Sequence, residues 1–171
     1  MRIGIFADTH DHVDNVRNCV NEFNRAGCEL VLFAGDWVSP IVVPPLRKLH
    51  CRVLACFGDN DANKVAIEGG LRIIGDVGEP PFCYKTPDGT KILMGHSAEQ
   101  LRGLVDGCDV AVYAHSHRAG IIRDERGRLF VNPGETSGWT FRKPSIAILE
   151  TEPLEARLVM LPEMPPVPAI E

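Results

Sequence analysis

The sequence has 171 residues, of which 44% are hydrophobic and 24% charged, and its formal net charge is −5. This composition is typical of a globular protein and excludes a disordered, collagen-like or coiled-coil chain. Every apolar run is far shorter than the roughly 20 residues that cross a bilayer, so we expect no membrane span. The first apolar run is interrupted too early, at Asp8, for a secretory signal, and we expect a cytoplasmic location. The acidic balance and the dispersed basic residues argue against an extended nucleic acid as partner.

Six cysteines are scattered along the chain without a Cys-x-x-Cys pair. A disulfide framework needs an oxidising compartment, which the absence of a recognisable export signal does not favour. Each cysteine lies in or beside an apolar stretch, so we expect free, mostly buried thiols.

The first third of the chain alternates between strand-like and helical patterns. Residues 1–7, Leu30–Ala34 and Arg52–Phe57 are short apolar runs typical of buried strands. Residues 13–26 carry apolar side chains at helical spacing, and a shorter helix is expected within Pro40–Leu49. This alternation predicts a parallel sheet with crossover helices.

From about residue 70 the pattern changes to short strands bounded by Gly, Pro and Asp, with one further helix over Glu99–Val105. The expected strands are Leu71–Ile74, Phe82–Thr86, Lys91–Met94, Val110–Ala114, Gly120–Arg123, Arg128–Val131, Ser145–Glu150 and Leu154–Leu161. So many strands need a second sheet, and the predicted fold is an α/β four-layer α-β-β-α sandwich of two mixed sheets flanked by helices. We expect one domain over residues 1–161 and an extended, proline-rich tail over residues 162–171.

Carboxylate, amide and imidazole side chains follow the predicted strands at the points where the strands end. The carboxyl ends of strands in an α/β sheet open on one crevice, so we expect these side chains to converge. They are Asp8, His10, Asp36, Asp59, Asn60, His96, His115 and His117. In extended backbone, residues two apart project to the same side, so the Asp8/His10 pair and the His115/His117 pair are each expected to hold one ion.

The number and type of these donors predict a pair of metal ions. The seven carboxylate and imidazole donors among them exceed what one ion can use, so two divalent ions sharing a carboxylate fit the count. Imidazole and carboxylate without thiolate favour Mn, Fe, Zn, Co or Ni. Such a pair lowers the pKa of a bridging water and stabilises a phosphoryl displacement, so we expect phosphoester hydrolysis. Each aspartate alone is typical of a turn or a helix cap, but turn chemistry does not call for His-x-His.

The order of these motifs resembles that of the calcineurin-like metallophosphoesterases, and in particular the small bacterial and archaeal phosphodiesterases. The motifs are Asp8-x-His10, Gly35-Asp36, Gly58-Asp59-Asn60-Asp61, Gly95-His96 and Ala114-His115-Ser116-His117. The resemblance covers residues 1 to about 160 and implies a β-sandwich flanked by helices, with a hydroxide between two ions as the nucleophile. It further implies a first ion held by Asp8, His10 and His117, a second held by Asp59, His96 and His115, and Asp36 as the bridge. Mn²⁺ is the metal we expect first.

The chain departs from the family pattern around the expected second ion. The family has Gly-Asn where this chain has Gly58-Asp59; we favour Asp59 as the ligand, with Asn60 as the alternative through a shifted turn. In larger members of the family the position of Asn60 is a histidine that protonates the leaving group. An amide cannot act as a general acid at neutral pH, so we expect a preference for leaving groups that need no proton.

Residues next to the motifs are expected to have supporting roles or none at the metal site. Ala114 replaces a glycine, and Glu135 follows Asn132-Pro133-Gly134 where the family commonly has a small hydroxyl residue; we expect neither to touch a ligand. The remaining expectations are helix capping for Asp11 and His12, an orienting role for Asp61, solvation for Arg118, and packing for Trp37 and Trp139.

These features together predict a dinuclear metal-dependent phosphoesterase, more specifically a phosphodiesterase acting on a small phosphoester, with Asp36, Asn60 and His96 as its catalytic residues. One alternative is a scaffold that keeps this fold, has lost catalysis and binds a protein partner, as the resembling retromer subunit does; such proteins usually have eroded ligands. A nuclease or nucleotide-directed phosphatase is the other alternative; the acidic surface argues against a nuclease but leaves short nucleotides open as substrates. Specificity would come from loops such as 37–45 and 135–141, and a homo-oligomer is compatible with these features.

Overall fold

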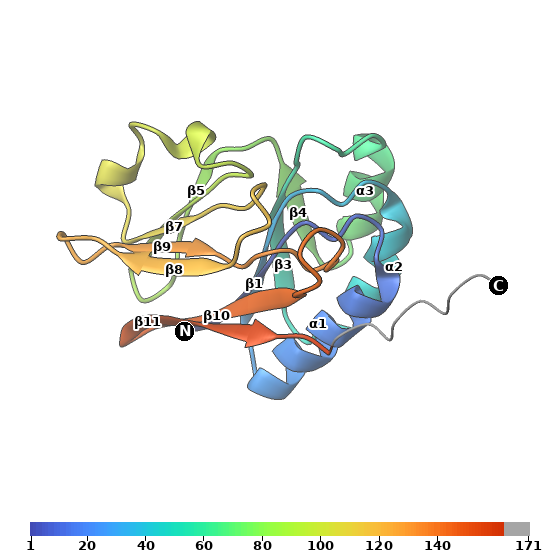
Figure 1. Ribbon diagram of the computed structural model, residues 1–171, viewed down its shortest axis with the longest axis horizontal. Helices are drawn as coiled ribbons and strands as arrows, with labels where there is room; N and C mark the ends of the chain where they lie inside the picture. The colour runs from blue at the N-terminus through green and yellow to red at the C-terminus, as the bar shows by residue number, and fades with distance from the viewer. Residues whose placement is uncertain (163–171) are drawn as a thin grey trace.

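The computed structural model describes residues 1–162 and shows two facing β-sheets, with the α-helices gathered over the outer face of one of them (Figure 1). The first sheet has the strand order β11-β10-β1-β2-β3-β4. Strands β1 to β4 are parallel to one another, β10 pairs antiparallel with β1, and β11 pairs antiparallel with β10. The strands are β1 (Arg2–Phe6), β2 (Leu30–Ala34), β3 (Arg52–Cys56), β4 (Gly75–Gly78), β10 (Ser145–Thr151) and β11 (Leu154–Met160).

The second sheet has the order β5-β6-β7-β9-β8 and is also mixed. Strands β6, β7 and β9 run parallel, and the edge strands β5 and β8 are antiparallel to their neighbours. The strands are β5 (Phe82–Lys85), β6 (Lys91–Met94), β7 (Val110–Val112), β8 (Gly120–Arg123) and β9 (Leu129–Asn132). Two mixed sheets confirm the predicted fold class.

The helical segments lie on the two outer faces. Helices α1, α2 and α3 cover the first sheet, as Figure 1 shows, while two short 3-10 helices, η2 and η3, pack on the outer face of the second. Their bounds are α1 (Val13–Ala26), η1 (Pro40–Val42), α2 (Val43–Leu46), α3 (Lys64–Leu71), η2 (Glu99–Leu101) and η3 (Val105–Gly107). No helix within residues 1–162 has the length and apolar character of a membrane span.

Alternate side chains of β1 point to opposite faces of the first sheet, so this strand contributes to both hydrophobic cores. Ile3 and Ile5 point toward the second sheet and belong to the core between the sheets, whereas Phe6 belongs to the core under the helices. Gly4 lies on the helix side, where a Cβ atom would stand 2.4 Å from the ring of Phe23 on α1. Glycine at this position therefore lets α1 approach the sheet closely.

Two predicted elements are wrong, and both errors involve glycine. The predicted strand Leu71–Ile74 is the end of α3 and the turn after it, and the strand itself is Gly75–Gly78. Helix α3 was not predicted because Gly69 and Gly70 have low helix propensity. The helix is stabilised by its buried apolar side chains Ile67 and Leu71. The predicted helix Glu99–Val105 is broken by Gly103, whose φ of +79° ends η2 before η3 begins.

The other elements of the sequence analysis occur with small shifts at their ends. The segment Pro40–Leu49 contains η1 and α2, and helix α1 and the remaining strands lie where the sequence predicts them. All six cysteines lie in the described part of the chain and are free, as expected. The predicted proline-rich tail falls, from residue 163 onward, outside the described residues.

Candidate metal centre

The carboxyl ends of five strands bring seven predicted ligands into two neighbouring groups. The loops after β1, β2 and β3 carry the aspartates and His10, and the loops after β6 and β7 carry the other three histidines. Within each group the candidate ligand atoms lie within 4.8 Å of one another, close enough for a single ion. The first group is Asp8, His10, Asp36 and His117, and the second is Asp59, His96 and His115.

Asp36 lies between the two groups. Its Oδ2 is 3.6 Å from Nε2 of His10 in the first group, and its Oδ1 is 3.4 Å from Nε2 of His96 in the second. The carboxylate is nearly inaccessible to solvent. One side chain thus presents one oxygen to each group.

Asn60 fixes the carboxylate of Asp36 in this orientation. Its backbone N–H donates to Oδ1 at 3.0 Å, and its side-chain amide donates to Oδ2 at 2.8 Å. Asp59, by contrast, points to the second group, where its Oδ2 lies 3.1 Å from Nδ1 of His115. The side chains of Asp59 and His115 are both more than half exposed, so the second group is the open side of the site.

The backbone at the site is left-handed where the sequence analysis assumed extended strands. This conformation is rare outside glycine, although Asp and His tolerate it better than most residues. It turns the side chains out of the strand direction and places His115 and His117 in different groups, so the expectation that this pair serves one ion is wrong. The residues concerned are Asp8 (φ +52°), His10 (φ +40°), Asp36 (φ +63°), His115 (φ +65°) and His117 (φ +60°).

Two histidines have their Nδ1 atoms fixed by acceptors. Nδ1–H of His96 donates to the carbonyl oxygen of Ala34 at 2.8 Å. Nδ1 of His117 lies 3.0 Å from Oε2 of Glu135, a buried carboxylate. A proton held on Nδ1 leaves the lone pair of Nε2 free for a cation.

The carboxylate of Asp8 is buried, and neither of its oxygens accepts a hydrogen bond from residues 1–162. Burial, together with the charge of Asp36, raises the pKa of Asp8 to about 8. Burial likewise lowers the pKa of His10. Buried carboxylates without hydrogen-bond partners are rare in proteins, and a cation satisfies both oxygens. The donor set therefore fits a divalent metal ion.

Buried polar side chains connect the loops of the site. Asp61 accepts hydrogen bonds from the backbone N–H groups of Val38 and Gly58, at 2.8 and 2.6 Å, and so has the orienting role expected of it. Asn132 donates to the carbonyl of Ala114 and to Oγ of Ser116, which supports the loop carrying His115 and His117.

Several smaller expectations can be compared with the structure. Nδ1 of His12 accepts from the backbone N–H of Asn15 and caps α1 as predicted, whereas Asp11 accepts from Ser39 instead. Trp37 is fully buried, as expected. Trp139 is 66% exposed, so its predicted packing is wrong.

Glu135 is the functional-site residue that the sequence analysis missed. We expected it to touch no ligand, and its contact with His117 shows that this was wrong. A single acidic residue 18 positions from its partner gives no periodic or motif signal, so only the fold brings the two together.

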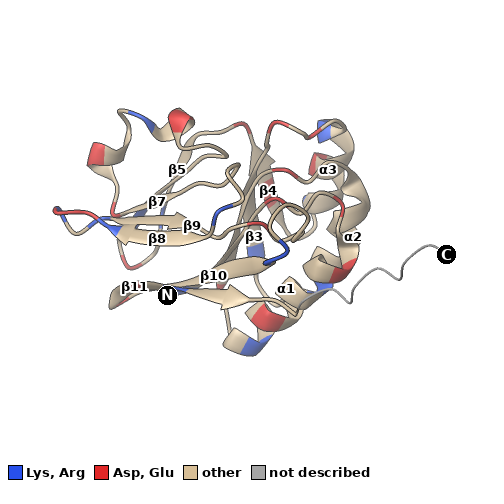
Figure 2. Ribbon diagram, viewed as in Figure 1, with Lys and Arg blue, Asp and Glu red and all other residues tan. Residues whose placement is uncertain are grey.

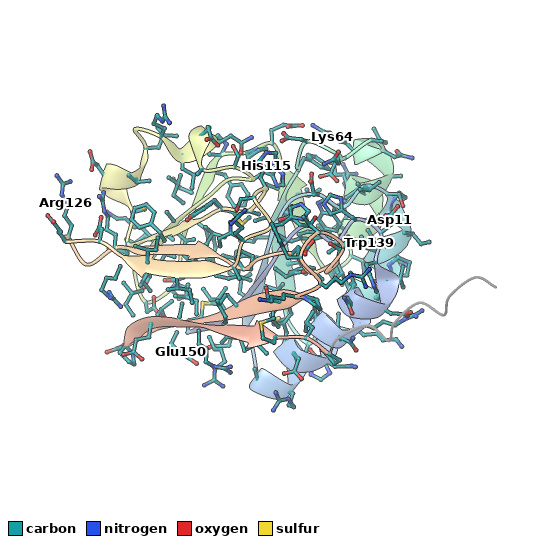
Figure 3. The ribbon with its side chains drawn as sticks, in the orientation of Figure 1. Asp11, Lys64, His115, Arg126, Trp139 and Glu150 are labelled. Carbon is teal, nitrogen blue, oxygen red and sulfur yellow. The ribbon has the colours of Figure 1, made fainter. Side chains whose placement is uncertain are left out.

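Figure 3 shows His115 and Trp139 on loops toward the middle of the molecule, with Arg126 far away at the β8–β9 hairpin. Lys and Arg are dispersed along the ribbon in Figure 2.

Two facing mixed sheets whose strand ends carry carboxylates and imidazoles define a fold of the metallophosphoesterase type. The chain belongs to the calcineurin-like phosphoesterase superfamily, whose domain model matches residues 1–153. This confirms the predicted family and the predicted class of enzyme, a phosphoric ester hydrolase.

Individual phosphodiesterases and phosphoesterases are also similar to this chain. A phosphodiesterase of Methanocaldococcus jannaschii is 32% identical over 169 residues, which cover 94% of this chain and 99% of that protein. The solved structure of an archaeal phosphodiesterase is 30% identical, with a TM-score of 0.86 over 94% of this chain and 100% of its own. A phosphoesterase from E. coli shares the fold, with 18% identity and a TM-score of 0.68 over 95% of this chain and all of its own.

Proposed function

We propose that this protein is a phosphodiesterase that hydrolyses small phosphodiesters at a centre of two divalent metal ions. The observation that carries the proposal is the place of Asp36, whose two oxygens face two separate groups of ligand atoms. The similarity to phosphodiesterases over nearly the whole chain supports the diester as substrate.

The donor set supports ions of the Mn, Fe, Zn, Co or Ni class, with Mn²⁺ as the first choice, because imidazole and carboxylate occur together without thiolate. When bound, such ions supply an activated water and neutralise charge on the phosphoryl oxygens. In this proposal Asp8, His10 and His117 hold one ion and Asp59, His96 and His115 the other. Asp36 contributes to both, and Asn60 keeps its carboxylate between them.

The position of Asn60 also supports a preference among leaving groups. Its amide is engaged with Asp36 and carries no proton that it could transfer at neutral pH. A phosphodiester whose leaving group is an acidic alcohol, such as a phenol, releases it without protonation, so such diesters should react fastest.

A phosphoester panel tests this proposal. Protein stripped with a chelator is reloaded separately with Mn²⁺, Ni²⁺, Zn²⁺ and Mg²⁺ and assayed on a bis-aryl diester, an aryl monoester and an alkyl diester. We expect the bis-aryl diester to react fastest, chelation to abolish turnover and Asp36→Asn to lower kcat by at least about 10²-fold. Asp14→Asn, on an exposed aspartate of α1, serves as the control and should leave the rate unchanged. A metal-free, inert protein would instead support the scaffold alternative.

A further inference from the structure

We propose that Glu135 is a positioning residue that fixes His117 for the first ion and links this ligand to the loop over residues 137–141. The evidence is the set of contacts around the carboxylate of Glu135, which is fully buried and has polar partners at both oxygens. The inference rests on the proposed function, because it assigns His117 to an ion.

The first contact is with the imidazole. Oε2 of Glu135 lies 3.0 Å from Nδ1 of His117, while Nε2 of the same ring lies 3.8 Å from Oδ1 of Asp8 and 3.3 Å from Nε2 of His10. The ring therefore has its Nδ1 edge on the carboxylate, with Oγ1 of Thr140 also 2.9 Å from Nδ1, and its Nε2 edge on the first group of ligands. A carboxylate on Nδ1 fixes the tautomer and the ring plane and makes Nε2 a stronger donor to a cation.

The remaining contacts are with the loop that follows. The backbone N–H of Thr140 donates to Oε2 at 2.9 Å, the N–H of Phe141 donates to Oε1 at 2.5 Å, and Oγ of Ser137 lies 3.4 Å from Oε2. Burial alone would raise the pKa of Glu135, but the N–H groups of Phe141 and Thr140 and the imidazole of His117 together lower it. The same carboxylate thus holds a metal ligand and the backbone of the loop.

That loop also carries two aromatic side chains that contact residues beside the first group. Trp139 is exposed and lies edge-on to the ring of His12, with ring centroids 5.7 Å apart. Phe141 is partly exposed beneath the guanidinium of Arg118, the residue after His117. A change at Glu135 should therefore alter both the binding of the ion by His117 and the position of Trp139 and Phe141.

Substitution by the isosteric amide tests the inference. Glu135→Gln offers one acceptor oxygen, so either Nδ1–H of His117 or the N–H of Phe141 faces an NH₂ group instead. We expect one of the two Mn²⁺ ions to bind about 10- to 100-fold more weakly by calorimetry and the other to bind unchanged. Activity should return at high Mn²⁺, which would not rescue a variant that is damaged in its fold. Ser137→Ala, which removes only the longest contact, is the matched control and should bind both ions normally.

A measurement on the unaltered protein keeps the inference testable if Glu135→Gln does not fold. In the metal-free protein at pH 8, nitrogen NMR of the His117 ring, assigned with His117→Asn, should show the proton on Nδ1 and none on Nε2. A proton on Nε2, or wild-type affinity for both ions in Glu135→Gln, would overturn the inference and leave the proposed function standing. Wild-type protein that binds no divalent ion would instead overturn the proposed function, while the ring tautomer still reports on the contact with Glu135.

Discussion

Gly58 lies directly against Asp36: a Cβ atom at position 58 would stand 2.2 Å from Oδ1 of the Asp36 carboxylate and 2.4 Å from its backbone nitrogen. Gly35 has a similar relationship to His96, whose Nδ1 would lie 2.7 Å from an added Cβ. The two glycines therefore allow the strand ends to approach closely enough for both groups of ligands to share Asp36.

Gly58→Ala should damage the centre through this contact. The added methyl group must displace Asp36, and we expect kcat to fall by about 10²-fold and the free energy of unfolding to fall by about 1–3 kcal/mol. Gly69→Ala is the control, because nothing lies within 4 Å of its added Cβ on helix α3; it should keep full activity and gain about 0.5–1 kcal/mol. Equal activities in the two variants, measured with saturating Mn²⁺, would contradict the role assigned to the contact.

The choice between Asp59 and Asn60 as a ligand can be decided by metal binding. Asp59 lies with His115, and the amide of Asn60 is bonded to Asp36. Asp59→Ala should therefore weaken binding of one ion more than Asn60→Ala does, in calorimetric titrations of chelator-treated protein with Mn²⁺. The opposite order would assign the ligand to Asn60.

Much of the fold could be predicted from local patterns, because apolar runs and helical spacing are readable one segment at a time. Strand β4 was misplaced because Gly75-Asp76-Val77-Gly78 has only one apolar side chain with strand preference, and its pairing with β3 is what makes it a strand.

The site was predictable to a similar degree. His and Asp residues at strand ends gave the members of both groups, but their division followed only from the family resemblance and not from residue spacing. That division depends on left-handed backbone at His115 and His117, which no spacing rule contains. The partner of Glu135 likewise depends on tertiary structure alone.

The raised pKa of Asp8 predicts how the metal-free protein responds to pH. Between roughly pH 4 and 8 the folded protein keeps a proton on Asp8 that the unfolded chain has released. Stability from this group is therefore present at low pH and lost as the pH rises toward 8, by at most about 1.4 kcal/mol per pH unit.

Urea denaturation in chelator at pH 5, 6, 7 and 8 measures this dependence. Asp8→Asn removes the titrating group and should flatten the curve relative to the wild type. If the two proteins change stability in parallel over this range, Asp8 does not hold the proton.

The two tryptophans should respond oppositely to the same substitution. Trp37 is fully buried against Phe33, with ring centroids 3.9 Å apart, and its Nε1–H donates to the carbonyl of Cys56 at 3.1 Å. Trp37→Phe loses the bond and leaves a cavity, and should lower the free energy of unfolding by about 1–3 kcal/mol. Trp139→Phe, at an exposed position, should change it by less than about 0.5 kcal/mol in the same urea titration.

The most direct test of the account is anomalous diffraction from crystals of the full chain soaked in Mn²⁺. We predict two anomalous peaks about 3.5–4 Å apart, one bonded to Asp8, His10 and His117, the other bonded to Asp59, His96 and His115, and both reached by the carboxylate of Asp36. A single peak, or peaks away from Asp36 in crystals of active protein, would contradict a shared two-ion centre.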